Sequence, residues 1–413
     1  MSTPNSPVQS HAPRDPIDPI DPIEPRESTY WKTKPVTPSN TRPSKYIQYN
    51  PHVPLSHTLP EPLHVTHILD GDPAINHVCE FLTQHYRRGT DSDYRIRYDV
   101  ARLEWEMNRT GSWIAVYNAN QIVGVVGLQC KTVQIHTHTK PMVEPMYLCV
   151  APEYQRTGVG RALMDMATQH CMDRGQSDGI FLANRMVAKP VACFRQYSRP
   201  LDYKRLRAND FVAIQGIDDT QVHNRTRVVL KPNSRYVVAE KTEANIALVH
   251  RMYCQYMETF CLHVVLTPQD IENYMFDSRY ARTVLVYEKN QPVDFVTYNF
   301  YDLENTNKES DNLIRVANVL MYSSNNVRVD LLFMNILKQI AMDRFDMLYV
   351  TDMMHSNEII LSNVRPSDYE TDPEEENASY DMQIIKTSKK LFVTAYGWGC
   401  EPMTQNMASW LVF

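Results

Sequence analysis

The sequence predicts an α+β protein with mixed sheets, built as two tandem domains of similar topology that are related by pseudo-twofold symmetry. The segment VYNANQIVGVV, which begins at Val116, returns 170 residues later as VYEKNQPVDFV at Val286, with six of eleven positions identical. Each copy is expected to form a strand, a tight turn and a second strand, because β-branched apolar runs flank an Asn-containing turn. The same order of elements surrounds both copies, which favours a duplication over a chance likeness of two hairpins.

The elements around each copy follow from the spacing of apolar residues. A helical pattern precedes each hairpin, at about residues 74–86 and 243–259. A strand follows each hairpin, ending at PMYLCV in the first copy and lying at about residues 315–322 in the second. After a loop, a second helix is predicted at about residues 160–174 and 329–344, and the latter leads into the strand FDMLYVT.

We expect an arm over residues 1–28, a first domain over 29–220 and a second domain over 221–413. The arm contains DPIDPIDPIEP, whose regular proline forbids helix and favours polyproline II. We interpret it as a flexible arm, and the alternative is a docking ligand that lacks the usual flanking basic anchor. The stretch 365–381 is acidic and turn-rich, which predicts an exposed loop.

Composition and charge argue against several classes of protein. A net charge of −6 is unlike a dedicated nucleic-acid binder, which needs a basic face. No stretch approaches 18 consecutive apolar residues and the N-terminus lacks a signal-peptide pattern, so we expect a cytoplasmic protein with no transmembrane segment. The eight cysteines include no CxxC pair, which favours reduced thiols and predicts no metal site. Nothing marks a homodimer face, so we expect a monomer.

Glycine is scarce, with 12 residues against 26 prolines, so a glycine pair between a strand and a helix stands out. The segment QRTGVGRALM contains Gly158 and Gly160 at such a junction. Glycines allow backbone N–H groups to point at an anion, and the start of a helix adds a partial positive charge. Arg156 and Arg161 add cations. The junction therefore predicts a phosphate site rather than a plain turn.

The second copy lacks the glycine pair. Its matching segment, NNVRVDLLFM, has Arg328 and Asp330 at the two glycine positions. The backbone freedom is lost there and a carboxylate is gained. We therefore expect only the first half to hold a phosphate-bearing cofactor.

The junction resembles the acyl-CoA pyrophosphate loop, Q/R-x-x-G-x-G/A, of the GCN5-related N-acyltransferases (GNAT). Two such domains in one chain resemble the glycylpeptide N-tetradecanoyltransferases, also called N-myristoyltransferases. The resemblance runs from residue 28 to the C-terminus, without the acidic loop. The segments that carry it are TYWKTKPV from Thr29, YRIRYD from Tyr94, MVEPMYLCV from Met142, AKPVACFRQYSRPLD from Ala188, RFDMLYVTDMM from Arg344 and GWGCEP from Gly397.

The resemblance implies transfer of myristate from myristoyl-CoA to the α-amino group of an N-terminal glycine on a protein or peptide, without a metal. The family's oxyanion site consists of two backbone N–H groups, which match Tyr147 and Leu148. The family's base is the C-terminal carboxylate, here that of Phe413. The implied acyl-CoA contacts are Tyr30, Trp31, Cys149, Val150, Gln155, Arg156, Thr157, Gly158, Val159, Gly160, Arg161 and Ala162.

The peptide groove is where the sequence departs from the family. The implied groove positions are Tyr86, Tyr94, Tyr98, Leu182, Gln196, Ser198 and Thr297. Leu182, Gln196 and Ser198 replace the family's hydroxyl, tyrosine and histidine. Arg87 and Arg88 replace its acidic residues, and the acidic insertion replaces its glycine-rich segment. Two alternatives stay open beside the family's activity: a GNAT-type acyltransferase for another acyl-CoA or amine, and an acyl-CoA-binding module that has lost catalysis.

Overall fold

The structure is a computed structural model of the chain, and it describes residues 30–38, 47–48, 59–69, 71–86, 93–211, 220, 228, 233–356 and 385–413. The proline-rich arm, Arg87, Arg88 and the acidic stretch 365–381 lie outside the described residues. So do residues 212–219 and 221–227, which surround the predicted domain boundary. The domain limits therefore stay a prediction.

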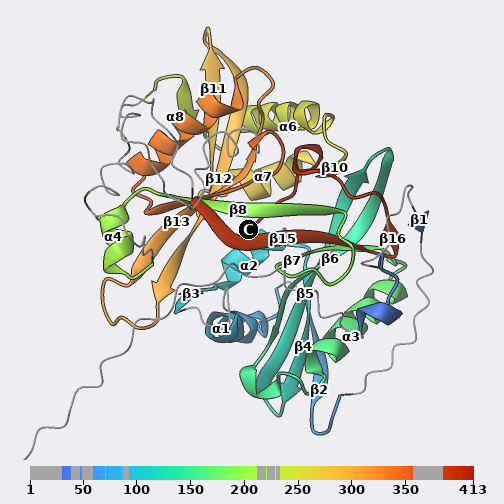
Figure 1. Cartoon of the computed structure of the whole chain (residues 1–413). Helices are drawn as coiled ribbons and strands as arrows, with labels where there is room; N and C mark the ends of the chain where they lie inside the picture. Colours follow the sequence, from blue (N-terminus) through green and yellow to red (C-terminus); the bar gives the residue numbers. More distant parts are fainter. Residues whose placement is uncertain are drawn as a thin grey trace, which may run out of the picture.

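A mixed sheet crosses the described part of the molecule (Figure 1). Its strands follow the order β2-β4-β5-β6-β7-β15-β8-β14-β13-β12-β11-β9, and β3 and β10 pair with β12 and β5. Parallel and antiparallel pairs both occur, which confirms the predicted α+β class with mixed sheets. The strands are β1 Ile47–Gln48, β2 His64–Leu69, β3 Tyr94–Ile96, β4 Ser112–Asn118, β5 Gln121–Ile135, β6 His138–Val150, β7 Gly179–Ala183, β8 Ala192–Pro200, β9 Tyr236–Val238, β10 Leu262–Val264, β11 Ala281–Glu288, β12 Gln291–Asn305, β13 Leu313–Tyr322, β14 Met347–Thr351, β15 Ile385–Tyr396 and β16 Trp398–Gly399.

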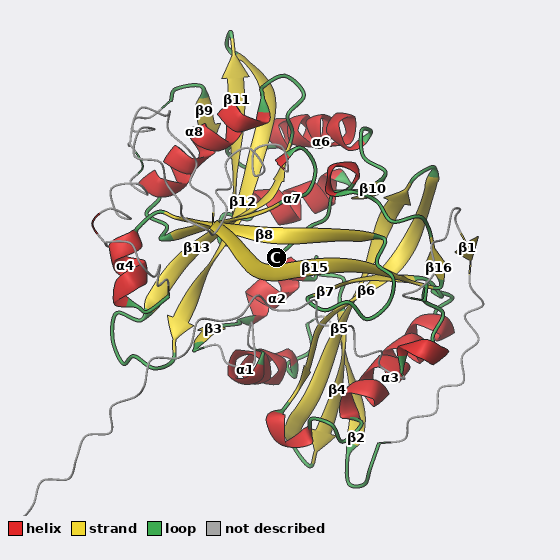
Figure 2. Ribbon diagram, viewed as in Figure 1, coloured by secondary structure: helices red, strands yellow, loops and turns green. Residues whose placement is uncertain are grey.

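Helices flank the sheet in both halves (Figure 2). The predicted helices form α1 Ile75–His85, α3 Val159–Asp173, α6 Glu243–Met257 and α8 Val329–Met342, each within two residues of the expected limits. The further helices are α2 Val100–Glu106, α4 Tyr203–Ala208 and α7 Pro268–Phe276, with 3-10 turns at Trp31–Thr33, Pro152–Tyr154 and Gln405–Met407. Side chains cap α2 and α7, because Asp99 accepts from the Arg102 N–H and Thr267 accepts from the Asp270 N–H.

The two halves exchange strands. β8 of the first half pairs with β14 of the second, and β15 of the second half pairs with β7 of the first. β8 and β15 lie side by side across the centre of the molecule (Figure 1). A smaller exchange repeats the arrangement, since β3 pairs with β12 and β10 pairs with β5. The strand order therefore reads alike from both edges, which is the pseudo-twofold relation expected from the repeat.

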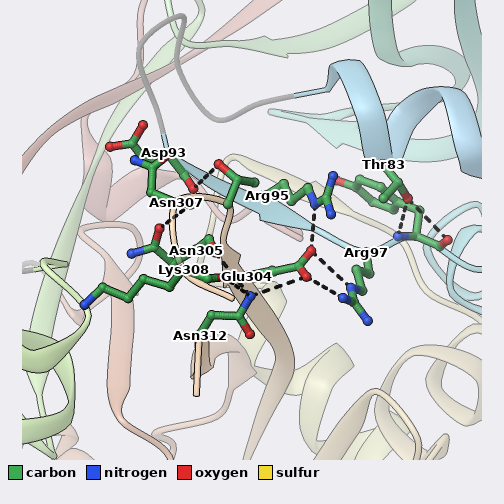
Figure 3. A network of polar contacts seen from close by, with 11 residues as sticks. Thr83, Asp93, Arg95, Arg97, Glu304, Asn305, Asn307, Lys308 and Asn312 are labelled. Atoms are coloured by element: carbon green, nitrogen blue, oxygen red, sulfur yellow. Dashed lines mark hydrogen bonds and ion pairs between the residues drawn. The ribbon is translucent and has the colours of Figure 1, made fainter. Parts of the chain in front are cut away.

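An ion-pair cluster supports one of these exchanges (Figure 3). Glu304 of β12 binds Arg95 of β3 and Arg97, which directly follows β3: Arg95 Nε lies 2.7 Å from Glu304 Oε2, and Arg97 Nη2 pairs with Oε1. The hydrogen bond from Arg97, followed by that from Arg95, lowers the pKa of Glu304 to about 2, so this carboxylate is charged at neutral pH. The cluster joins the short strand β3 to the second half of the molecule.

Candidate active site

The strand that precedes α3 separates from its parallel neighbour. Within the described chain, β6 pairs with β7 at one position, Val143 opposite Gly179. Further along, β6 changes register against β5, so that Val126 faces both Tyr147 and Leu148. Tyr147 has a φ of +56°, and the strand therefore contains a β-bulge. A bulge removes its extra residue from the ladder, which leaves backbone groups available to a ligand.

Gly158 begins α3 in a left-handed conformation. Its φ is +100°, and it directly precedes the first helical residue, Val159. A residue with a Cβ is strained at such a φ. Gly160 has no positive φ, and a Cβ added there would meet Val150 Cγ2 at 3.6 Å, which is an ordinary contact. Backbone conformation therefore explains Gly158 but not Gly160, whose small size leaves space beside the start of the helix.

The other residues predicted to contact acyl-CoA include a buried group and an exposed group. The buried ones are Cys149, Val159 and Ala162, and the exposed ones are Gln155, Arg156, Thr157, Gly158 and Arg161. Thr157 Oγ1 donates to the Tyr154 carbonyl at 2.6 Å, which holds the turn before α3. The exposed side of the junction thus combines two guanidinium groups with the start of a helix.

Residues 30–38, which we call the strap, pack against α3 and β7. Tyr30 Oη donates to Asp165 Oδ1 at 2.9 Å, and Lys34 Nζ forms an ion pair with the same oxygen. The side chains of Lys34 and Asp165 are only 3% and 4% exposed. Trp31 stacks on Phe181 with ring centroids 5.3 Å apart. A buried charge pair and an aromatic stack therefore hold the strap in place.

A cavity lies between α3, the strap and strands β5, β6 and β7. The cavity is partly open to solvent and has a volume of about 50 Å³. Its walls are mostly apolar, with Trp31 from the strap, Val143 from β6, Ala167 from α3, Phe181 from β7 and Tyr396 from β15. The cavity lies next to the point where β6 and β7 separate.

Both halves hold the C-terminal segment. Asn318 Nδ2, from β13, donates to the Val412 carbonyl at 2.8 Å. Trp410 Nε1 donates to Glu144 Oε1, from β6, at 3.3 Å. Glu144 also forms an ion pair with Lys131, and the two side chains are 5% and 3% exposed. The last residues are therefore fixed between β6 and β13, which occupy matching places in the two halves.

The aromatic side chain of Phe413 is also enclosed. Its ring centroid lies 5.2 Å from that of Trp105 on α2 and 5.3 Å from that of Tyr274 on α7. Trp105 and Tyr274 are fully buried, and Phe413 is half-buried. The terminal residue therefore packs where helices of the first and second halves meet.

Of the predicted groove residues, the structure brings two tyrosines to the bulge. The rings of Tyr86 and Tyr98 lie 5.4 and 5.7 Å from that of Tyr147. Tyr94 lies in another cluster, and its hydroxyl donates to the Asn209 carbonyl. The aromatic surface beside the bulge therefore comes from the residue that ends α1, Tyr86, and from the segment after β3.

The remaining groove positions lie within strands. Thr297 is fully buried in β12, and its hydroxyl is 2.8 Å from that of Thr283. Gln196 and Ser198 are buried in the exchanged strand β8, two residues apart and so on the same face. Leu182 is half-buried in β7. These side chains shape the centre of the sheet rather than an exposed surface.

The thiols at the junction are not activated. Burial raises the pKa of Cys149 to about 12, and burial first of all raises that of Cys171 to about 11. A protonated thiol is a weak nucleophile. The described residues contain no group of three or more His, Cys, Asp or Glu that could hold a metal. None of the described helices is long and apolar enough to cross a membrane.

Sequence reasoning missed two buried ion pairs, Lys34–Asp165 and Lys131–Glu144. A lysine within a strand of apolar residues, such as Lys131 in GVVGLQCKTVQI, indicates a buried partner, because an unpaired buried charge is costly. The partner itself could not be identified, since it lies on another element.

Comparisons with known proteins agree with this architecture. The model of the Acetyltransferase (GNAT) family matches residues 77–192. The glycylpeptide N-tetradecanoyltransferase of Aspergillus fumigatus is 23% identical over 274 residues, covering 62% of this chain and 55% of the relative. A probable glycylpeptide N-tetradecanoyltransferase of Caenorhabditis elegans is 22% identical over 72% of this chain and 68% of its own length. The chain thus spans about half the length of the first of these relatives.

Among solved structures, Saccharomyces cerevisiae N-myristoyltransferase with bound myristoyl-CoA has a TM-score of 0.80 at 14% identity, covering 92% of this chain and 95% of the other. The fold and the strand–helix junction define a duplicated GNAT-type acyltransferase fold. Within that class, the chain is similar to glycylpeptide N-tetradecanoyltransferases in sequence, at 22–23% identity, and to an N-myristoyltransferase in fold.

Proposed function

We propose that the protein transfers a myristoyl group from myristoyl-CoA to the α-amino group of an N-terminal glycine. The observation that carries the proposal is the β6–α3 junction, where a bulged strand, a left-handed glycine and an apolar cavity meet. The relation to glycylpeptide N-tetradecanoyltransferases supports the same assignment.

The start of α3 suits the pyrophosphate of an acyl-CoA. The first N–H groups of a helix have no partner within the helix and carry a partial positive charge. Arg156 and Arg161 are exposed beside them, and Gly160 leaves room for close approach of a ligand. The apolar cavity lined by Trp31 is proposed to widen around the acyl chain, because burying a long chain there removes apolar surface from water.

The bulge in β6 supports an oxyanion site. We assign the backbone N–H groups of Tyr147 and Leu148 to the carbonyl oxygen of the thioester, where negative charge develops during transfer. Fixed donors of this kind lower a barrier by about 3–4 kcal/mol. Since the donors belong to the backbone, a tyrosine at position 147 is compatible with the role.

The carboxylate of Phe413 is proposed to accept a proton from the glycine ammonium. An α-carboxyl has a reference pKa of about 3.5 and an α-amino group about 8, so this transfer costs roughly 6 kcal/mol in bulk water. The ring of Phe413 packs against Trp105 and Tyr274. In general, removal of water raises the pKa of a carboxyl and lowers that of an ammonium, which narrows this gap. The neutral thiols at the junction favour direct attack by the amine over an acyl-enzyme.

The first test is acylation of matched peptides that differ only at residue one. The full chain is incubated with myristoyl-CoA and a peptide beginning with glycine or alanine, and the products are analysed by mass spectrometry. We expect acylation of the glycine peptide alone, because a Cβ beside the amine crowds the attack on the thioester. Acylation of the alanine peptide and not the glycine peptide would contradict the proposal.

The second test separates the base from the packing of the last residue. A one-residue extension beyond Phe413 displaces the carboxylate by about 3.5 Å. It should lower kcat by about 100-fold or more with little change in Tm, since general bases contribute about 10²–10⁴-fold. The matched control is Phe413→Leu, which keeps a carboxylate in place and should retain most of kcat. Unchanged kcat in the extended chain would rule out the carboxylate as base.

The third test compares acyl donors. If the apolar cavity holds a long acyl chain, myristoyl-CoA should raise Tm at far lower concentration than acetyl-CoA does, since tighter binding stabilises more at equal ligand concentration. Equal shifts from the two donors would favour an acyltransferase for a shorter chain. Binding without acylation of any peptide would favour an acyl-CoA-binding module.

A further inference from the structure

The second half contains a buried carboxylate at the place that corresponds to the phosphate junction. Asp294, in β12, is fully buried. Its Oδ1 accepts from Ser323 Oγ at 2.9 Å and from the Asn325 N–H at 2.8 Å. Its Oδ2 accepts from the N–H groups of Asn326 and Val327 at 2.9 and 2.8 Å. Successive amides before α8 therefore surround an anion supplied by the chain itself.

The repeat identifies the counterpart of this carboxylate. Asp294 matches Gly124 in the duplicated hairpin, 170 residues earlier. A Cβ placed on Gly124 would meet Val159 Cγ1 at 3.0 Å and Leu163 Cδ1 at 3.1 Å, so this position faces the first turn of α3. The hairpin of the first half thus presents no side chain to its junction, whereas that of the second half presents a carboxylate.

The surroundings of Asp294 are those of an anion site and not of an ion pair. None of the ion pairs among the described residues includes Asp294. Nearby Arg328 pairs instead with Asp330 at 2.6 Å on the surface. The charge of Asp294 is therefore stabilised by backbone N–H groups, a hydroxyl and the start of α8, the same kinds of group that bind phosphate at helix starts.

We propose that Asp294 is a built-in substitute for a phosphate: its carboxylate fills the anion position of the second half and confines phosphate-bearing ligands to the first. This residue determines which half can bind such a ligand, and it also holds the loop that begins α8. The proposal concerns the half without the glycine pair and does not depend on acyl transfer.

The test is anion rescue of the full chain carrying Asp294→Gly, which recreates the residue found at position 124. We expect Tm to fall by roughly 3–6 °C. Inorganic phosphate or formate, at ionic strength balanced with chloride, should raise Tm more in this variant than in the wild type. The wild-type response accounts for phosphate bound in the first half. Equal responses in the two proteins would overturn the proposal.

Asp294→Asn provides a second variant of the same shape, in case the glycine variant does not fold. An amide nitrogen cannot accept a hydrogen bond, so hydrogen exchange should accelerate by about 10-fold or more either at Asn325 or at Asn326 and Val327, depending on which oxygen the nitrogen replaces. Phosphate should not reverse this effect, because the side chain still fills the position. Unchanged Tm and exchange in Asp294→Asn would show that the negative charge is not required. Both readouts are independent of catalysis, so their failure would leave the proposed function standing.

Discussion

The two halves of the molecule differ in how the strand before the strand–helix junction pairs with its parallel neighbour. Within the described chain, β6 pairs with its parallel neighbour at Val143 alone, whereas β13 pairs with β14 through Val316, Ala317 and Asn318. β13 also shifts register against β12, between Thr297 and Tyr298, but the left-handed residue Tyr147 and the apolar cavity belong to the first half. A small difference in strand pairing therefore decides whether one duplicated fold is open at the junction or closed.

In the second half, where β13 stays paired with β14, residues of β13 bind other parts of the chain. Asn318 donates through Nδ2 both to Asn299 Oδ1 at 2.9 Å and to the Val412 carbonyl at 2.8 Å. The paired strands β13 and β14 thus support the C-terminal segment through Asn318. The two halves thus differ in what lies at this place: a cavity beside β6 in the first half, and a hydrogen bond from β13 to Val412 in the second. The variants below test this contrast.

The largest loss of stability is expected from a variant that breaks the contact between α3 and the strap. Lys34→Met leaves Asp165 as a buried charge without its cation, which costs about 3–5 kcal/mol. Because the strap can detach and expose Asp165 to water, we expect a loss near the lower end, about 3 kcal/mol, in the free energy of unfolding measured with urea. Trp31 should detach together with the strap, and the loss of its contacts should weaken binding of myristoyl-CoA.

The matching position on α8 offers the control. Asp165 corresponds to Asn335, which accepts a hydrogen bond from Asn233 Nδ2 at 3.1 Å. Asn335 Nδ2 also donates to the Leu331 carbonyl at 2.8 Å, so Asn335→Ala removes two neutral hydrogen bonds and should cost about 1–2 kcal/mol. The double variant Lys34→Met with Asp165→Leu should recover most of the lost stability, because a buried ion pair can be replaced by apolar groups. Equal losses for Lys34→Met and Asn335→Ala would contradict the contrast between the two helices.

The second-largest effect is expected from Gly124→Asp, a variant that tests whether one substitution can close the junction of the first half. Gly124→Asp copies the carboxylate of the second half into the first, where it would compete with a bound phosphate for the start of α3. We expect the affinity for myristoyl-CoA, measured by titration calorimetry, to fall about 100-fold, or ~2.7 kcal/mol.

Gly124→Ala is the steric control for this variant, because it meets the same contacts with Val159 and Leu163 without adding charge. Its loss of affinity should stay below about tenfold. If alanine weakens binding as much as aspartate does, crowding and not charge distinguishes the two junctions.

The smallest effect concerns the backbone at the helix start. Gly158→Ala places a Cβ at a φ of +100° in open space, so its cost of about 1–2 kcal/mol is conformational. The counterpart Arg328 has a φ of −57°, and Arg328→Ala should change the free energy of unfolding by less than about 0.5 kcal/mol. Urea unfolding of both variants checks the difference. Equal losses would mean that the left-handed conformation is not specific to the first half.

The repeat made most of the fold predictable. Helical spacing located α1, α3, α6 and α8 within two residues, and the hairpins at Val116 and Val286 form as expected. The exchange of β8 and β15 could not be predicted, because local sequence determines that a segment is a strand but not which half it joins. Pairing partners depend on contacts between residues far apart in the chain.

The candidate site was predictable in part for the same reason. Gly158 stood out because glycine is rare in this chain and sits between a strand and a helix. The carboxylate of Asp294 did not stand out, although the repeat aligned it with Gly124. The role of Asp294 depends on the backbone N–H groups of residues 325–327. Only the structure shows that these groups lie next to its carboxylate.

The strand exchange also affects how the chain can fold. β15, at Ile385–Tyr396, lies between β7 and β8, whose residues precede their partners in β15 by about 190 to 220 positions. Pairing across such separations is slow, because a large loop must close before any contact forms. During synthesis the first half emerges with β7 lacking its partner, and an unpaired strand edge invites aggregation. Neither half can complete its sheet alone, so the two should acquire their native pairing in one cooperative step after the last strand is made.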